Sequence, residues 1–98
     1  MILEHAILDV VFGQEQEFEE AFGRATAVIA ASRGFGSLRL ERCLEQPNRY
    51  VLLVEWETLE DHTVGFRGSA AYEEWRKLLH HFYDPFPSVE HFERILVR

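Results

Sequence analysis

Histidine and aromatic side chains gather toward the end of this 98-residue chain. Four of its five histidines and more than half of its aromatic residues lie in roughly the last two fifths of the sequence: His62, His80, His81, His91, Phe66, Tyr72, Trp75, Phe82, Tyr83, Phe86 and Phe92. A neutral imidazole can accept a proton near physiological pH. Aromatic walls suit flat apolar molecules. The cluster therefore predicts a pocket for a flat, hydrophobic, oxygen-bearing ligand.

Four residues of this cluster could carry chemistry, and each has a structural alternative. His62 is either a general base or donor in the pocket, or an exposed residue of a short helix. Arg67 lies between two glycine-flanked turns and either binds an anionic or phenolate oxygen or remains solvated. Tyr72 and Trp75 follow helical spacing, so they either line the pocket or fill the core. Three further residues are predicted to form the apolar walls of a substrate site: Phe66, Leu79 and Trp56.

Other reaction types have little support in the sequence. There is no Gly-rich phosphate loop, no CxxC, no HExxH and no GxSxG motif. The lone Cys43 is interpreted as a small, buried or half-buried strand residue. No histidine spacing supports a metal site, so neither a metal nor another cofactor is expected. His80 and His81 are adjacent and would point about 100° apart on a helix, so both cannot face one site.

Hydrophobic periodicity predicts the elements that position these residues. Strands are expected over residues 2–12, 36–45, 49–57 and 88–97, and a helix over 14–33. The Pro47-Asn48 turn joins the second and third strands as an antiparallel hairpin. The order is β-α-β-β-α-β, which is the ferredoxin-like α+β arrangement of a four-stranded antiparallel sheet with helices on one face. We expect a single domain over residues 1–98.

The second helix is predicted to be broken. Thr58 to Asp61 has the form of a capping box, so a short helix should start near residue 59. Gly65 and Gly68 should end it, and Ser69 can cap a further helix. A broken helix packs less tightly over a sheet than a continuous one, and this makes the segment a reasonable place for a cavity.

The predicted strands are apolar on both faces. In the third strand Tyr50, Leu52, Val54 and Trp56 fall on one face, while Val51 and Leu53 fall on the other. Helices can cover one face only, and monomers rarely expose large apolar patches. We therefore expect a homodimer formed through the open sheet face; a partly apolar exposed sheet is the alternative. His5 and His91, on the first and last strands, are not expected to pair.

Charge and composition restrict the partners. The net charge of −7 argues against nucleic-acid binding and against an anionic membrane surface. No apolar run reaches the ~20 residues of a membrane span. The first residues do not resemble a signal peptide, and a single cysteine fits a reducing compartment, so a cytoplasmic location is expected.

Two segments resemble a known family. The stretch from Trp56 to His62, and the stretch from Phe66 through Tyr72 to Trp75, are similar to the pattern of antibiotic biosynthesis monooxygenase domains, of the dimeric α+β barrel superfamily. The resemblance covers essentially the whole chain. It implies a homodimer whose sheets face each other and a pocket between sheet and helices in each protomer. Some relatives oxygenate polycyclic phenols or quinols with molecular oxygen, without metal or flavin. The resemblance implies that His62, Arg67, Tyr72 and Trp75 serve that reaction.

Other relatives in the superfamily suggest different functions. Haem-degrading members share an Asn on the first strand, a Trp on the short helix and a His about ten residues later. This chain has His5, Gly65-Phe66 and Trp75 near those places, which argues against haem breakdown. Members without demonstrated catalysis leave a second hypothesis, a non-catalytic dimeric binding or stress-response module. A solvent-connected cavity lined by His62 and its aromatic neighbours would favour the enzyme.

Overall fold

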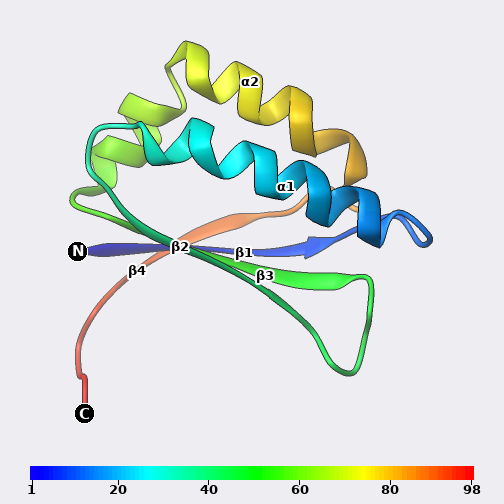
Figure 1. The fold of residues 1–98 in the computed structure, drawn as a ribbon. Coiled ribbons are helices and arrows are strands. Elements are labelled where there is room, and N and C mark those ends of the chain that lie inside the picture. Colours follow the sequence, from blue (N-terminus) through cyan, green and yellow to red (C-terminus); the bar gives the residue numbers. More distant parts are fainter.

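Four antiparallel strands form one sheet, and the two long helices lie together on one of its faces (Figure 1). The computed structural model describes all of residues 1–98. The elements are β1 (Ile2–Asp9), α1 (Glu15–Ala30), β2 (Phe35–Arg42), β3 (Arg49–Trp56), the π-helical turn η1 (Asp61–Phe66), α2 (Ala70–Leu79), the 3-10 turn η2 (His80–Phe82) and β4 (Val89–Glu93). The predicted β-α-β-β-α-β order and ferredoxin-like class are confirmed.

The strand order β2-β3-β1-β4 puts β1 in the middle of the sheet. Its partners run antiparallel on both sides, and Glu4 lies opposite Val54 of β3 and His91 of β4. Side chains at directly opposed positions project from the same face of a sheet. The register therefore brings Glu4 and His91 together under the helices, although they are far apart in the sequence.

The core lies between the helices and the sheet. The alternation predicted for β3 is confirmed, because Tyr50, Leu52, Val54 and Trp56 are buried while Val51 and Leu53 are only partly covered. Helix α1 buries the face that its spacing predicts: Phe18, Ala21, Phe22, Ala25 and Ile29. Burial of one such large apolar side chain contributes about 1.5–3 kcal/mol, so this interface is a major source of stability.

All four strands end earlier than their sequence patterns predict, with β2 ending at Arg42 instead of residue 45 and β3 at Trp56 instead of residue 57. The pattern of β1 continues to residue 12, but the strand ends at Asp9, because Val10 bonds instead to Asn48 and bridges Tyr83. The pattern of β4 covers 88–97, but the strand ends at Glu93, which lies opposite Ile2, the first residue of β1. After this pair β1 has no further residues to pair with, so the alternating apolar residues that follow Glu93 have no neighbouring strand to bond to.

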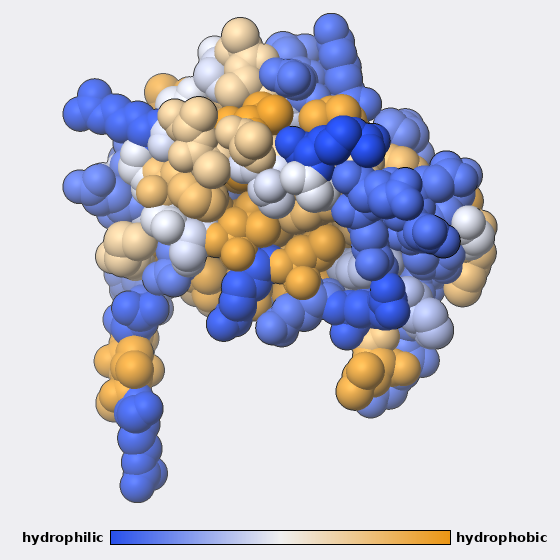
Figure 2. Space-filling view, in the orientation of Figure 1, coloured by the Kyte–Doolittle hydropathy of each residue, from blue (hydrophilic) through white to orange (hydrophobic).

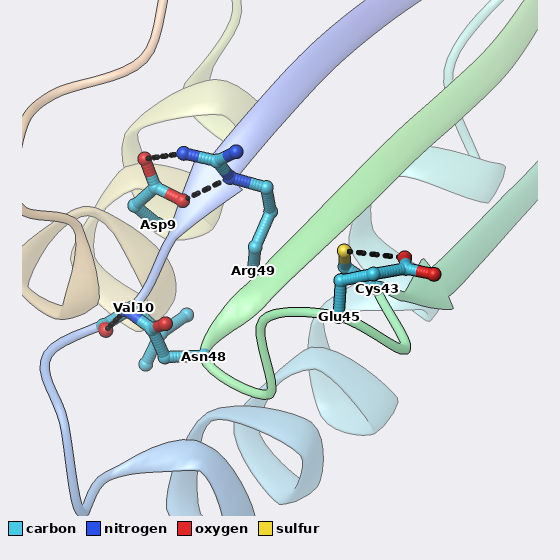
Figure 3. Close-up of polar contacts among 6 residues, drawn as sticks. All are labelled: Asp9, Val10, Cys43, Glu45, Asn48 and Arg49. Carbon is cyan, nitrogen blue, oxygen red and sulfur yellow. Dashed lines mark hydrogen bonds and ion pairs between the residues drawn. The ribbon is translucent and has the colours of Figure 1, made fainter.

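Polar contacts close the hairpin end of the sheet (Figure 3). The Arg49 guanidinium forms a two-pronged ion pair with Asp9 across β1 and β3, with its shorter N···O distance at 2.8 Å. The Asn48 amide donates to the carbonyl of Val10, and the Val10 amide donates back to the carbonyl of Asn48. Cys43 lies nearby and is partly exposed, as expected for a strand-end thiol.

The break in the second helix is confirmed. Thr58 and Asp61 cap the short helix reciprocally, each side chain accepting the other's backbone N–H. After η1, Gly68 passes so close to the carbonyl of Val64 that a Cβ would lie 2.7 Å from that oxygen. Ser69 then accepts from the amide of Tyr72 and starts α2. The chain can therefore turn sharply between the two helical pieces.

Apolar side chains also remain outside the core. The segment after β4 leaves the body of the molecule and exposes Ile95, Leu96 and Val97 (Figures 1 and 2). Leu44, in the connection between β2 and β3, is likewise exposed. None of the helices combines the length and the apolar character that crossing a membrane requires.

Candidate functional site

A cavity of about 290 Å³ lies between the sheet and the broken helix. Its floor comes from β1 and β3, its roof from η1 and α2, and one wall from the segment that joins α2 to β4. The residues around it are Glu4, Ala6, Leu8, Leu52, His62, Phe66, Arg67, Tyr72, Trp75, His80, Tyr83, Phe86, Pro87 and Val89. Most of these residues are apolar, and the polar groups are few, which is typical of small-molecule sites.

Glu4 places a carboxylate in the floor of this cavity. It is 6% exposed, on the face of β1 that is otherwise apolar. Its Oε1 atom accepts a 2.9 Å hydrogen bond from Trp56 Nε1 and lies 3.3 Å from His62 Nε2. Burial raises the pKa of Glu4, while the Trp56 bond and the charge of Arg67 oppose that effect. An acid with a raised pKa can exchange a proton closer to neutral pH than an exposed glutamate.

His62 is enclosed beside Glu4. Its ring stacks on Trp56 at 5.3 Å between centroids, and its side chain is 3% exposed. Burial lowers the pKa of His62 to about 3, with the charges of Arg67 and His91 acting in the same direction. The imidazole is therefore neutral at pH 7. Although the Glu4–His62 distance falls in the range of ion pairs, the contact joins a neutral ring to the carboxyl group.

His91 completes a short polar chain. Its Nε2 atom lies 2.8 Å from Nδ1 of His62, so one imidazole donates and the other accepts. His91 is only partly buried, and burial together with Arg67 lowers its pKa. The chain Glu4–His62–His91 thus leads from the cavity floor to the β4 edge of the sheet.

Arg67 supplies the positive charge at the cavity. It follows η1 directly, is exposed, and forms no ion pair in this chain. Its charge adds to the burial that lowers the pKa values of His62 and His91, and it opposes the burial that raises the pKa of Glu4. A cation that favours the anionic form of a neighbouring carboxyl group would equally favour a phenolate or enolate bound in the cavity.

The remaining walls are aromatic. Tyr72 meets Phe66 edge-to-face at 5.5 Å, and Phe66 in turn contacts Trp75 at 5.8 Å. No hydrogen bond within the chain uses the hydroxyl of Tyr72 or of Tyr83, so these hydroxyls remain available to a ligand. Burial and the charge of Glu4 raise the pKa of Tyr83, which is therefore protonated at pH 7.

The predicted site residues divide into two groups. Five of them surround the cavity together: His62, Phe66, Arg67, Tyr72 and Trp75. Trp56 and Leu79 are fully buried behind it and do not line it; Trp56 instead holds Glu4 and stacks on His62. His80 lines the cavity while His81 is exposed, in agreement with the argument from adjacent helical positions.

Three polar residues of this region, Glu4, Tyr83 and His91, are assigned no site role from the sequence. Glu4 could have been found, because it is the one charged residue among the inward positions 2, 4, 6, 8 and 10. Tyr83 and His91 had no such signal, since their approach depends on the path after α2 and on the β1–β4 register. His5 and His91 indeed do not pair; His5 contacts Phe92 on the opposite face. No group of three or more His, Cys, Asp or Glu side chains is arranged to hold a metal ion.

The sequence model of the antibiotic biosynthesis monooxygenase family matches residues 1–78 of the chain. This protein belongs to that family. A curated relative, the uncharacterized protein YczJ of Bacillus subtilis (strain 168), is 54% identical over 95 residues, which cover 97% of this chain and all of the relative. The family resemblance drawn from the segments around His62 and Tyr72 is thereby confirmed.

Solved structures agree with this family assignment. A Bordetella bronchiseptica protein proposed to be an antibiotic biosynthesis monooxygenase superposes with a TM-score of 0.93 at 39% identity, over 97% of both chains. A point mutant of SnoaB of Streptomyces nogalater, a cofactor-independent oxygenase, superposes with a TM-score of 0.82 at 21% identity, over 98% of this chain and 94% of its own. At that identity the second likeness concerns the fold alone.

Proposed function

We propose that this protein is a small cofactor-independent monooxygenase that binds a flat phenol, quinol or anthrone-type molecule in the cavity. The observation that carries the proposal is the pairing of an aromatic-walled cavity with one polar corner, formed by Glu4, His62 and Arg67. The corner holds a neutral imidazole, a buried carboxyl group and an unpaired guanidinium. Membership of the family and the fold shared with an oxygenase are consistent with this reading.

The proposed reaction begins with removal of a proton from the bound aromatic molecule. The resulting anion is electron-rich enough to reduce molecular oxygen itself. For an anthrone the overall change is CH₂ + O₂ → C=O + H₂O, in which the substrate supplies all four electrons. One oxygen atom enters the product, the other leaves as water, and the proton removed at the start is returned to that water. The protein is required to bind, to accept the proton and to stabilise the anion.

Each predicted site residue has a part in this scheme. His62 keeps the polar corner in place for proton removal, and Arg67 stabilises the phenolate or enolate oxygen. Tyr72 and Trp75 hold the flat rings, with the Tyr72 hydroxyl directed to a substrate oxygen. Phe66 contributes to the same aromatic wall. Trp56 and Leu79, behind the cavity, support it from the core rather than by touching the ligand.

The proposal includes a homodimer formed through the open face of the sheet. That face carries Leu3, Val51 and Leu53, all partly covered, together with Ile7 at 40% and Phe92 at 48% exposure. These apolar side chains lie opposite the helices, where nothing within one chain covers them (Figure 1). A second copy would bury them, as the resemblance to dimeric α+β barrels implies.

Oxygen uptake by the purified protein with anthrone tests the reaction. We expect uptake above the uncatalysed rate, and a loss of about 100-fold in His62→Ala, the scale of a displaced reacting geometry, because the polar corner loses the ring that packs against Glu4. Tyr72→Phe should lower the rate by a smaller factor, and the exposed control His81→Ala should leave it unchanged. Unchanged rates in both His62→Ala and Tyr72→Phe would refute the site. Tight binding of anthrone without uptake would support the non-catalytic binding module instead.

A further inference from the structure

We infer that Glu4 is the residue that directly binds the ligand's hydroxyl group, through its second carboxylate oxygen, and that it takes the proton from that group. The inference deepens the proposed function and rests on it. Neither the sequence patterns nor the family resemblance assigns Glu4 a role.

Both ring nitrogens of His62 lie against protein atoms. Nε2 faces Glu4 Oε1 at 3.3 Å, and Nδ1 faces His91 Nε2 at 2.8 Å. One face of the ring is covered by Trp56. A base must bring a lone pair within about 2.6–3.2 Å of the proton-bearing atom. His62 has no nitrogen left for a ligand, so in this geometry it is a positioning residue.

Glu4, in contrast, has one oxygen to spare. Oε1 accepts a hydrogen bond from Trp56 and lies against Nε2 of His62, whereas no hydrogen bond within the chain reaches Oε2. Only one side-chain polar atom is both fully enclosed and without a partner, and that atom is Oδ1 of Asn48. Glu4 Oε2 also has no partner within the chain, so it cannot be fully enclosed and must have access to open space. Because Glu4 lines the cavity and is otherwise buried, that access is from the cavity. A buried acceptor without a partner is costly, and a ligand donor would satisfy it.

The surroundings of Glu4 suit a proton transfer to Oε2. Trp56 and His62 fix the carboxyl plane, so the free oxygen does not need to be reoriented when a ligand enters. Arg67 stands at the same cavity and can stabilise the negative charge as it moves from carboxylate to ligand oxygen. In the step itself the ligand O–H bond breaks and a carboxyl O–H bond forms. No electrons are exchanged until oxygen reacts.

Binding of two naphthalenes that differ in one hydroxyl donor tests the inference without requiring catalysis. 2-Naphthol carries a hydroxyl group, and 2-methoxynaphthalene has the same rings with that proton replaced by a methyl group. A hydrogen bond to a charged acceptor corresponds to about tenfold or more in affinity. We expect calorimetry at pH 7.5 to show the wild-type protein binding 2-naphthol at least about tenfold more tightly than 2-methoxynaphthalene.

The variant Glu4→Gln should remove this preference. Its amide oxygen can still accept from Trp56, which turns the amide NH₂ toward the cavity, where it can donate to the oxygen of either compound but accept from neither. The ratio of the two dissociation constants should fall to about one. The matched control Glu20→Gln changes an exposed glutamate on α1 and should keep the wild-type ratio. An unchanged ratio in a folded Glu4→Gln protein would overturn the inference.

A second measurement needs no variant. In wild-type protein the ¹³C resonance of the Glu4 carboxyl carbon should move on addition of 2-naphthol and stay in place with 2-methoxynaphthalene. Equal responses to both compounds would overturn the role of Glu4 while leaving the aromatic site intact. Failure of both compounds to bind would overturn the proposed function and the inference together, so the two failures can be told apart.

Discussion

Acidification should destabilise this protein through His62, and the effect can be measured by comparison with the variant His62→Gln. The imidazole is neutral in the folded chain, where its pKa is about 3, but has a pKa near 6.5 when unfolded. Between these values the unfolded chain binds one proton more than the folded chain. Stability therefore falls as pH falls through this window.

The magnitude follows from the two pKa values. Between pH 7.5 and 5.5 the unfolded His62 goes from mostly neutral to mostly charged, while the folded residue stays neutral. The linkage relation gives a loss of about 1.4 kcal/mol in the free energy of unfolding from this residue alone. His91, whose pKa is also lowered, adds to the wild-type loss. Glu4 acts in the opposite direction, because its raised pKa favours the folded state at low pH.

Urea unfolding of wild type and His62→Gln at pH 7.5 and 5.5, followed by tryptophan fluorescence, isolates the contribution of His62. Trp56 and Trp75 are buried and report the transition. The variant should lose about 1.4 kcal/mol less than wild type on acidification. Protein concentration must be constant, since association alters apparent stability. The exposed control His81→Gln should lose as much as wild type.

One outcome would refute this reasoning directly. If His62 formed a true ion pair with Glu4, its pKa in the folded chain would be raised, and the ring would stabilise the protein at low pH. His62→Gln would then lose more stability than wild type between pH 7.5 and 5.5. Equal losses would mean that burial does not hold the ring neutral. Either result would also remove His62 as a neutral positioning residue.

Three further predictions concern the framework around the site. Gly34→Ala should lower the free energy of unfolding, measured in urea, by about 2 kcal/mol. The reason is that φ is +81° at this position and a Cβ would lie 2.0 Å from the carboxylate of Asp61, which caps η1. An unchanged free energy of unfolding would contradict the role of Asp61 as a cap. Ser69→Ala should lower stability by about 1 kcal/mol through loss of the α2 cap at Tyr72, with Ser69→Thr as the conservative control. Wild-type protein should sediment at about twice the chain mass and Leu53→Asp at the mass of one chain, whereas a monomeric wild type would disprove the sheet-face dimer.

The local elements can be predicted from the sequence because short-range rules govern them. Apolar residues of α1 recur at helical spacing, and β3 alternates cleanly, so both elements and their buried faces follow directly. The capping pair Thr58 and Asp61, and the cap at Ser69, depend on residues three positions apart. Strand ends are predicted less well, since a strand continues only as far as another strand lies beside it.

The composition of the candidate site can be predicted only in part. Tyr72 and Trp75 are three residues apart on α2, so helical spacing puts them on one face, whereas Phe66 reaches them because η1 packs beside α2. Trp56 and Leu79 are predicted beside them but point into the core, because the rotation of each element about its axis is fixed by packing. The aromatic pattern does not distinguish a wall that faces a cavity from one that faces protein.

The sequence by itself determined the kind of surface that this chain would build: an aromatic pocket with histidine and arginine under a broken helix on a ferredoxin-like sheet. The tertiary structure decided which polar atoms in that pocket are free. Glu4, His62 and His91 lie on three different elements, and the β1–β4 register and the position of η1 bring them together. Hydrogen bonds between such distant residues depend on distances of a few tenths of an ångström, which only the packed fold sets.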